Sequence, residues 1–298
     1  MAEGRWAMPN TREELLFSAH SLQSYVDCAR RFELNYLEEL KWPAVESEPL
    51  LESERHMTDG RRFHEMVHRD TLGISVASPS AEGDEDLARW WGNYQTHQPA
   101  QGEGDVRFAE KTLVGSVNGR TLMATCDLVV IDGDVNEGGA EGDRCKARIY
   151  DWKTWRRRHS REWLQGRLQT RIYPYLLVQS GAALTEGAAE IRPQDVEMVY
   201  WYSEFPENGG EVFAYSEAQY REDESYLNSL IDEIMVREAG SFELTSNEKQ
   251  CTYCVYRSFC DRGAVAGDFG ESEGEGQDAG EEASPLLANL DDYESIAF

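Results

Sequence analysis

The segment between Val106 and Ile131 constrains the fold of this 298-residue chain more than any other. Two runs of apolar and β-branched residues flank the dipeptide Asn118-Gly119. This dipeptide suits the type I′ turn of a two-residue β-hairpin, because both of its residues tolerate positive φ. The segment therefore predicts two antiparallel strands, over 106–117 and 121–131.

The rest of the chain adds helices on both sides of these strands. Strand character recurs in the stretches 147–152, 196–202 and 212–215. Apolar residues at helical spacing occur over 18–40, 58–72, 87–94, 161–179 and 217–237. The fourth of these helices contains Pro174, which should kink it. Helices followed by strands and further helices are typical of an α/β core with a mixed sheet.

Two acidic residues lie on neighbouring predicted strands. Asp127 is in the second strand of the hairpin, and Asp151-Trp152-Lys153 closes the next strand. Because side chains alternate along a strand, the Asp151 carboxylate and the Lys153 ammonium point to the same face. A second carboxylate from a neighbouring strand would complete a pocket for a hard divalent cation. This is the minimal equipment for cleaving a phosphodiester.

The net charge of −27 would by itself argue against a nucleic-acid partner, but the charges are unevenly distributed along the chain. The stretch 264–298 is rich in acids, Gly and Ser and has no Lys or Arg, so we expect a disordered acidic tail that solubilises the chain or docks on a partner. Positive charge is concentrated directly after the Asp151 strand, and a polyanion responds to local potential. The predicted DNA-binding residues are Arg156, Arg157, Arg158, Arg161, Arg167 and Arg171.

Four of the six cysteines have the spacing of a metal or cluster site. Cys251, Cys254 and Cys260 lie close together, and Cys28 is in the first predicted helix. Three close thiolates and a distant fourth suit a Cys₄ iron–sulfur cluster or a zinc site. The chain shows no signal peptide and no apolar run of membrane-spanning length, so we expect a cytoplasmic location without a membrane partner. In such a reducing compartment, metal binding is more common than disulfides.

These motifs, in this order, resemble those of the RecB-like nucleases of the PD-(D/E)xK superfamily. The resemblance rests on the opening helix Ser18–Phe32, Gly60-x-x-x-His64, Asp127, Asp151-x-Lys153 and Gln169-x-x-x-Tyr173. It implies a restriction-endonuclease-like core with a central mixed sheet flanked by helices, and N- and C-terminal helical parts joined by a Cys₄ cluster. The implied nuclease domain covers 18–263, between an N-terminal extension (1–17) and the acidic tail (264–298).

The resemblance also implies roles for individual residues. The metal, Mg²⁺ or Mn²⁺, is expected on His64, Asp127, Asp151 and the backbone carbonyl of Trp152. Lys153 would position the metal-activated water. Gln169 and Tyr173, which share one helix face, would complete the catalytic set. The cysteines are similar to those of the AddB and CRISPR-associated members, so a [4Fe–4S] cluster is expected rather than zinc. Its ligands would be Cys28, Cys251, Cys254 and Cys260.

The function implied is that of a metal-dependent DNA nuclease, with exonuclease action on single strands or ends in repair or recombination. The chain has no Gly-x-x-x-x-Gly-Lys-Ser/Thr motif, so a helicase or an integrase would be a separate subunit. One alternative is a weakly active or inactive DNA-binding subunit of a repair or CRISPR-adaptation complex. A more remote alternative is a zinc metalloprotease, because His64-Glu65-Met66-Val67-His68 matches H-E-x-x-H.

Overall fold

The computed structural model describes residues 15–41, 48–80, 83–99, 102–132, 145–187 and 189–263. The chain forms two compact units. Of the described residues, the larger contains 16–19 and those between 59 and 232, and the smaller combines those between 20 and 58 with 233–263. The acidic tail and nearly all of the N-terminal extension lie outside the described residues, so the domain boundaries stay predictions.

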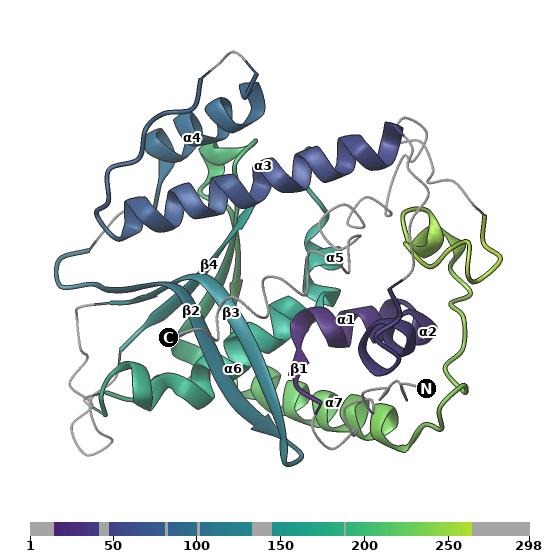
Figure 1. Cartoon of the computed structure of the whole chain (residues 1–298). Coiled ribbons are helices and arrows are strands. Elements are labelled where there is room, and N and C mark those ends of the chain that lie inside the picture. The colour runs from purple at the N-terminus through teal and green to yellow at the C-terminus, as the bar shows by residue number, and fades with distance from the viewer. Residues whose placement is uncertain are drawn as a thin grey trace, which may run out of the picture. The chain divides into compact units, whose positions relative to one another are not determined.

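A six-stranded mixed sheet forms the larger unit (Figure 1). The antiparallel hairpin β2 (Val106–Val117) and β3 (Arg120–Ile131) is its longest pair. Asn118 and Gly119 have φ of 49° and 71°, as a type I′ turn requires, so the hairpin prediction is confirmed.

The remaining strands extend the sheet on one side of the hairpin. β4 (Ala147–Lys153) is antiparallel to β3 and parallel to β5 (Val196–Tyr202). β6 (Glu211–Ala214) is antiparallel to β5, and the short β1 (Phe17–Ser18) is parallel to β3. This combination makes the sheet mixed, in agreement with the predicted fold class.

The predicted helices are present, with two unexpected breaks. The helices are α1 (Ala19–Asp27), α2 (Ala29–Phe32), α3 (Glu48–Thr71), α4 (Glu85–His97), α5 (Arg161–Gly166), α6 (Leu168–Leu184) and α7 (Glu217–Val236). Shorter turns are π-helical over Glu33–Leu37 and 3₁₀ over Pro193–Asp195, Pro206–Asn208 and Glu248–Cys251. None of the helices in the described part of the chain is long and apolar enough to cross a membrane.

Both breaks come from extended backbone at a single residue. Cys28, at φ −161° and ψ 105°, separates α1 from α2. Arg167, at φ −75° and ψ 140°, separates α5 from α6, whereas Pro174 lies inside α6. The predicted helix over 161–179 is therefore interrupted before the proline rather than at it.

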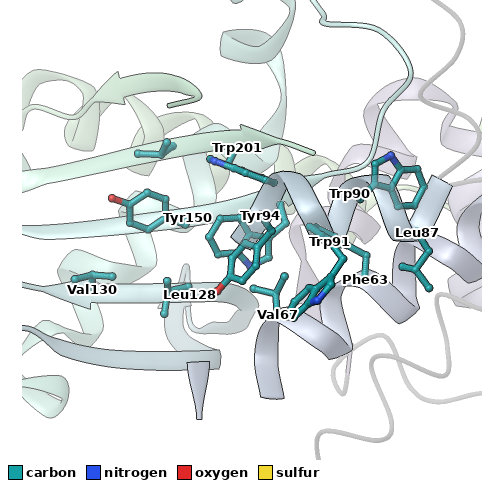
Figure 2. Close-up of a cluster of buried hydrophobic side chains, with 12 residues drawn as sticks. Phe63, Val67, Leu87, Trp90, Trp91, Tyr94, Leu128, Val130, Tyr150 and Trp201 are labelled. Atoms are coloured by element: carbon teal, nitrogen blue, oxygen red, sulfur yellow. The ribbon is translucent and has the colours of Figure 1, made fainter. Parts of the chain in front are cut away.

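One face of the sheet packs against α3 and α4 through an aromatic core (Figure 2). Trp152 of β4 and Trp201 of β5 meet edge to face, with ring centroids 5.6 Å apart. The core residues are Phe63, Val67, Leu87, Trp90, Trp91, Tyr94, Leu128, Val130, Tyr150, Trp152, Val199 and Trp201. Because side chains alternate along a strand, the residues between them point to the opposite face, which α6 covers.

Candidate active site

Asp127 lies where the backbone pairing of β3 is interrupted on both sides. Toward β4, the ladder ends one residue short of Asp127, so Asp127 and Asp151 face each other where the two strands stop pairing. Toward β2, the ladder skips only Glu110, the residue directly opposite Asp127. Three carboxylates, those of Glu110, Asp127 and Asp151, thus occupy one row across three neighbouring strands.

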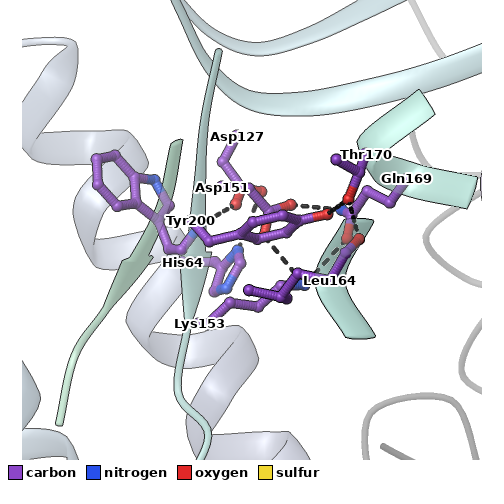
Figure 3. Close-up of polar contacts among 9 residues, drawn as sticks. His64, Asp127, Asp151, Lys153, Leu164, Gln169, Thr170 and Tyr200 are labelled. Atoms are coloured by element: carbon purple, nitrogen blue, oxygen red, sulfur yellow. Dashed lines mark hydrogen bonds and ion pairs between the residues drawn. The ribbon is translucent and has the colours of Figure 1, made fainter. Parts of the chain in front are cut away.

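Side-chain contacts replace the missing backbone pairing of Asp127 (Figure 3). Its Oδ2 accepts a hydrogen bond from the Trp152 N–H at 2.7 Å, and its Oδ1 lies 3.1 Å from Nδ1 of His64 on α3. Burial alone would raise the pKa of Asp127, but His64, the Trp152 N–H and Lys153 together hold that pKa below its usual value. Asp127 is therefore an anion at neutral pH and is fixed in place.

Asp151 is buried, and its contacts come from β4 and α6 (Figure 3). Oδ1 accepts a hydrogen bond from Nε2 of Gln169 at 2.5 Å, and Oδ2 lies 3.0 Å from Nζ of Lys153. Lys153 Nζ also donates to Oε1 of Gln169 at 3.3 Å. Burial raises the pKa of Asp151 to about 7; Lys153 opposes this shift and Asp127 adds to it.

Glu110 is the site residue that the sequence prediction missed. A ligand atom of Glu110 lies within 4.8 Å of those of His64 and Asp127, so the three side chains could hold a metal ion. Glu110 has φ 48°, a left-handed conformation that costs a residue with a side chain about 1–3 kcal/mol and is often found at functional sites. The hairpin register contained the signal, because a two-residue turn at Asn118-Gly119 places Glu110 opposite Asp127.

The chemistry of these side chains fits a divalent cation. Carboxylate oxygens from Glu110, Asp127 and Asp151 are the hard ligands that Mg²⁺ and Mn²⁺ prefer, and the imidazole of His64 favours Mn²⁺. A further indication comes from Asp151 Oδ2, which is buried and has no hydrogen bond of suitable geometry from a described residue, only the ion pair with Lys153. A bound cation would satisfy this oxygen.

The other predicted site residues surround this group. Tyr173 follows Gln169 by one turn of α6, and burial, reinforced by the charge of Asp151, holds the pKa of its hydroxyl well above the usual value. Neither His68 nor Asp151 belongs to the group of possible metal ligands found among the described residues, so Asp151 as a ligand stays a prediction. The role of the Trp152 carbonyl stays a prediction.

The arginines predicted to bind DNA have different surroundings. Arg171 donates to the fully buried Asp223 at 2.9 Å, and Arg161 pairs with Glu211. Arg157 and Arg158 are exposed, and neither is paired with a carboxylate in the described part of the chain. Arg156 is exposed as well, and the Arg167 guanidinium lies over the Trp163 ring.

In the smaller unit, the four predicted cluster cysteines lie near one another. The thiols of Cys251, Cys254 and Cys260 each interact electrostatically with Cys28. Burial raises the pKa of all three, to about 11 for Cys260, and the neighbouring thiols add to the shift. Among the described residues, no three of these sulfur atoms lie within 4.8 Å of one another. In a tetrahedral zinc site with bonds of about 2.3 Å, the sulfurs are only about 3.8 Å apart.

Comparison with known proteins identifies the family. The model of the PD-(D/E)XK nuclease superfamily matches residues 16–261, and the chain belongs to this superfamily. Nucleases of this superfamily use divalent metals. The family therefore supports the interpretation of the carboxylate row as a nuclease metal site and not as the zinc site of a protease. No curated protein matches the chain in sequence.

A solved structure is also similar to this chain. It is the crystal structure of a candidate exonuclease from Eubacterium rectale, with 10% sequence identity and a TM-score of 0.42. The match covers 77% of this chain and 86% of that chain.

Proposed function

We propose that this chain is a DNA nuclease of the RecB-like type, which hydrolyses phosphodiester bonds with Mg²⁺ or Mn²⁺. The observation that carries the proposal is the row of carboxylates at the interrupted ladder, with Lys153 beside Asp151. The proposed metal ligands are His64, Glu110, Asp127, Asp151 and the Trp152 carbonyl. A metal bound there supplies an activated water and polarises the scissile phosphate.

The surrounding residues prepare the site for that chemistry. Lys153 neutralises the buried Asp151 and offers its ammonium to the charge that develops on the phosphate. Gln169 contacts both of these residues, so it fixes their relative position. His64 and the Trp152 N–H hold the Asp127 carboxylate from two sides. Tyr173, whose raised pKa keeps its hydroxyl protonated, is a hydrogen-bond donor next to this group.

The resemblance to RecB-like nucleases favours exonuclease action on single strands or ends, in DNA repair or recombination. It also favours a separate helicase or integrase subunit as a partner, and a cytoplasmic location. The exposed arginines Arg156, Arg157 and Arg158 would bind the phosphate backbone.

A cleavage assay with the full chain tests the nuclease proposal. Wild-type protein should degrade end-labelled linear DNA when Mn²⁺ or Mg²⁺ is present and stop when EDTA is added. Asp151→Asn should be at least about 10³-fold slower, because it removes a charged metal ligand. Glu162→Gln, an exposed position on α5, serves as the matched control and should cleave normally. If wild type and Asp151→Asn leave DNA equally intact, the nuclease proposal fails. The alternative function, that of a DNA-binding subunit, would then be favoured.

We further propose that Cys28, Cys251, Cys254 and Cys260 bind an iron–sulfur cluster. Their mutual proximity supports one shared site, and the resemblance to the AddB and CRISPR-associated nucleases favours a cluster over a single zinc ion. Protein purified without oxygen should be brown and contain iron, and Cys254→Ser should lose both properties. Cys126→Ser, at a buried cysteine in the larger unit, should keep them. Colourless protein that contains only zinc would overturn this assignment.

A further inference from the structure

A group of aromatic side chains begins two residues after Lys153. The rings of Trp155 and His159 meet edge to face at 4.6 Å between centroids, and those of His159 and Trp163 stack at 4.1 Å. All three side chains are half-buried, unlike the fully buried rings of the core. We refer to Trp155, His159 and Trp163 as the aromatic platform.

Lys153 connects the platform to the candidate metal site. Its Nζ lies 3.0 Å from Asp151 Oδ2 and 4.8 Å from the centroid of the Trp155 ring. A phosphate that contacts Lys153 would therefore have the base of its own or the next nucleotide within reach of Trp155. A strand held at Lys153 would therefore pass next to the platform.

Arginine side chains lie over rings of the platform and of its neighbour Tyr202. The guanidinium of Arg167 is 4.9 Å from the centroid of Trp163, and that of Arg158 is 5.1 Å from the centroid of Tyr202. Arg158 is exposed, and a guanidinium stacked on a ring can still present its N–H edge to a phosphate. Rings that stack on bases, interleaved with cations that bind phosphates, are the usual equipment for holding a single strand.

Tyr202, a buried residue of β5, packs against the platform. Its ring packs 6.0 Å from that of Trp155, and it is only 1% exposed. Its hydroxyl is buried and forms no hydrogen bond with a described residue. Because this hydroxyl is enclosed, Tyr202 supports the Trp155 ring and does not itself offer a contact to a bound strand.

We propose that the aromatic platform, with Trp155 nearest the metal site, binds unpaired bases next to the scissile phosphate and is the part of the site that distinguishes a single strand from a duplex. Inside a duplex, both faces of each base are covered by its neighbours, so only a single strand or a frayed end offers a free face. The proposal rests on the nuclease function proposed above, because it assigns base-binding, specificity-determining residues to that site.

Binding measurements in EDTA test the platform without hydrolysis. The full chain is titrated into a fluorescein-labelled single strand and into the duplex of the same sequence, with fluorescence anisotropy as the readout. Trp155→Ala should weaken single-strand binding about tenfold or more, since stacking contributes about 1–3 kcal/mol per base. Duplex binding should change little. Trp155→Phe, which keeps a ring, should restore most of the affinity.

Tyr226→Ala is the matched control. Tyr226 is 37% exposed on α7 and has Arg171 at 5.0 Å over its ring, but it belongs to no part of the platform. This variant should bind both DNAs like wild type. Thermal unfolding of each variant separates loss of the platform from loss of the fold. Wild-type protein that binds single strand and duplex equally, or Trp155→Ala that loses both equally, would overturn the proposal.

The two proposals fail in different ways. If the protein binds single strands through Trp155 but cleaves nothing with Mn²⁺, the nuclease proposal is wrong. If it cleaves single-stranded and duplex DNA equally well and Trp155→Ala changes neither rate, the platform proposal is wrong and the nuclease proposal remains.

Discussion

The two faces of the sheet use neighbouring residues of the same strands for opposite purposes. On β4, Tyr150 and Trp152 pack into the aromatic core, whereas Asp151 and Lys153 face α6. The core face consists of rings and aliphatic side chains. The other face has polar contacts and two interruptions of the ladder around Asp127. The contrast shows that tight packing on one face of a sheet can hold carboxylates in place on the opposite face, even where their hydrogen bonds within the protein are incomplete.

The largest stability effect should come from the core face. Trp201→Ala removes a fully buried ring that packs against Trp152 and Phe63, so the free energy of unfolding should fall by about 3–5 kcal/mol. Chemical denaturation in EDTA measures this change.

Asp151→Asn is the counterpart on the polar face. Its free energy of unfolding in EDTA should equal or exceed that of wild type, because the substitution removes a buried charge that Asp127 repels, while Lys153 keeps the Asp127 carboxylate as a counterion. If both variants lose the same free energy of unfolding, the claim that only the core face stabilises the fold is wrong.

The next effect distinguishes two arginines, Arg171 and Arg158, that the sequence analysis both predicted to bind DNA. Arg171→Ala leaves the buried Asp223 without its cation and should lower the free energy of unfolding by about 3 kcal/mol. Arg158→Ala should change stability by less than about 0.5 kcal/mol but reduce the salt dependence of DNA binding by about one unit of slope. A reversed pattern in denaturation and salt titrations would show that Arg171, not Arg158, faces the DNA.

A smaller effect is expected at the strained position of the site. Glu110→Asn removes a carboxylate but suits the left-handed backbone, so stability should rise by about 1 kcal/mol while Mn²⁺ affinity falls about tenfold. Glu186→Asn is the matched control, since Glu186 is exposed and has φ 53°. Isothermal titration should find its Mn²⁺ affinity unchanged. An equal loss of affinity in both variants would remove Glu110 from the site.

The last effect concerns pH. The pKa of Asp151 is raised from 3.8 to about 7, so the metal-free folded state holds a proton that the unfolded chain releases. The stability from this proton is complete below pH 4 and is lost as pH rises toward about 7. Mn²⁺ requires the carboxylate, so its affinity should fall by up to about tenfold per pH unit below 7 and level off above. Titrations at several pH values test this, and the Asp151 contribution must vanish in Asp151→Asn.

The parts of this molecule that depend on local sequence were predictable. The Asn118-Gly119 turn fixed the hairpin and its register, and the alternation along β4 indicated that Asp151 and Lys153 share a face. The chain order of the motifs then pointed to the family that matches residues 16–261.

Features that depend on tertiary contacts were not predictable in the same way. The backbone of Glu110 turns left-handed inside a strand, and no local residue pattern announces this. The partner of Arg171, Asp223, lies far along the chain on α7. The break at Cys28 likewise occurs at a residue without a helix-breaking signal, whereas Gly166, directly before the break at Arg167, was a signal that the prediction did not use.

Anomalous diffraction from crystals soaked in Mn²⁺ tests the central claim most directly. The row of carboxylates predicts one strong manganese peak about 2.1 Å from oxygen atoms of both Asp127 and Asp151. Asp127→Asn crystals treated in the same way should lose the peak. A peak between His64 and His68, or wild-type crystals without a peak near Asp127, would contradict the assignment of this row as the catalytic metal site.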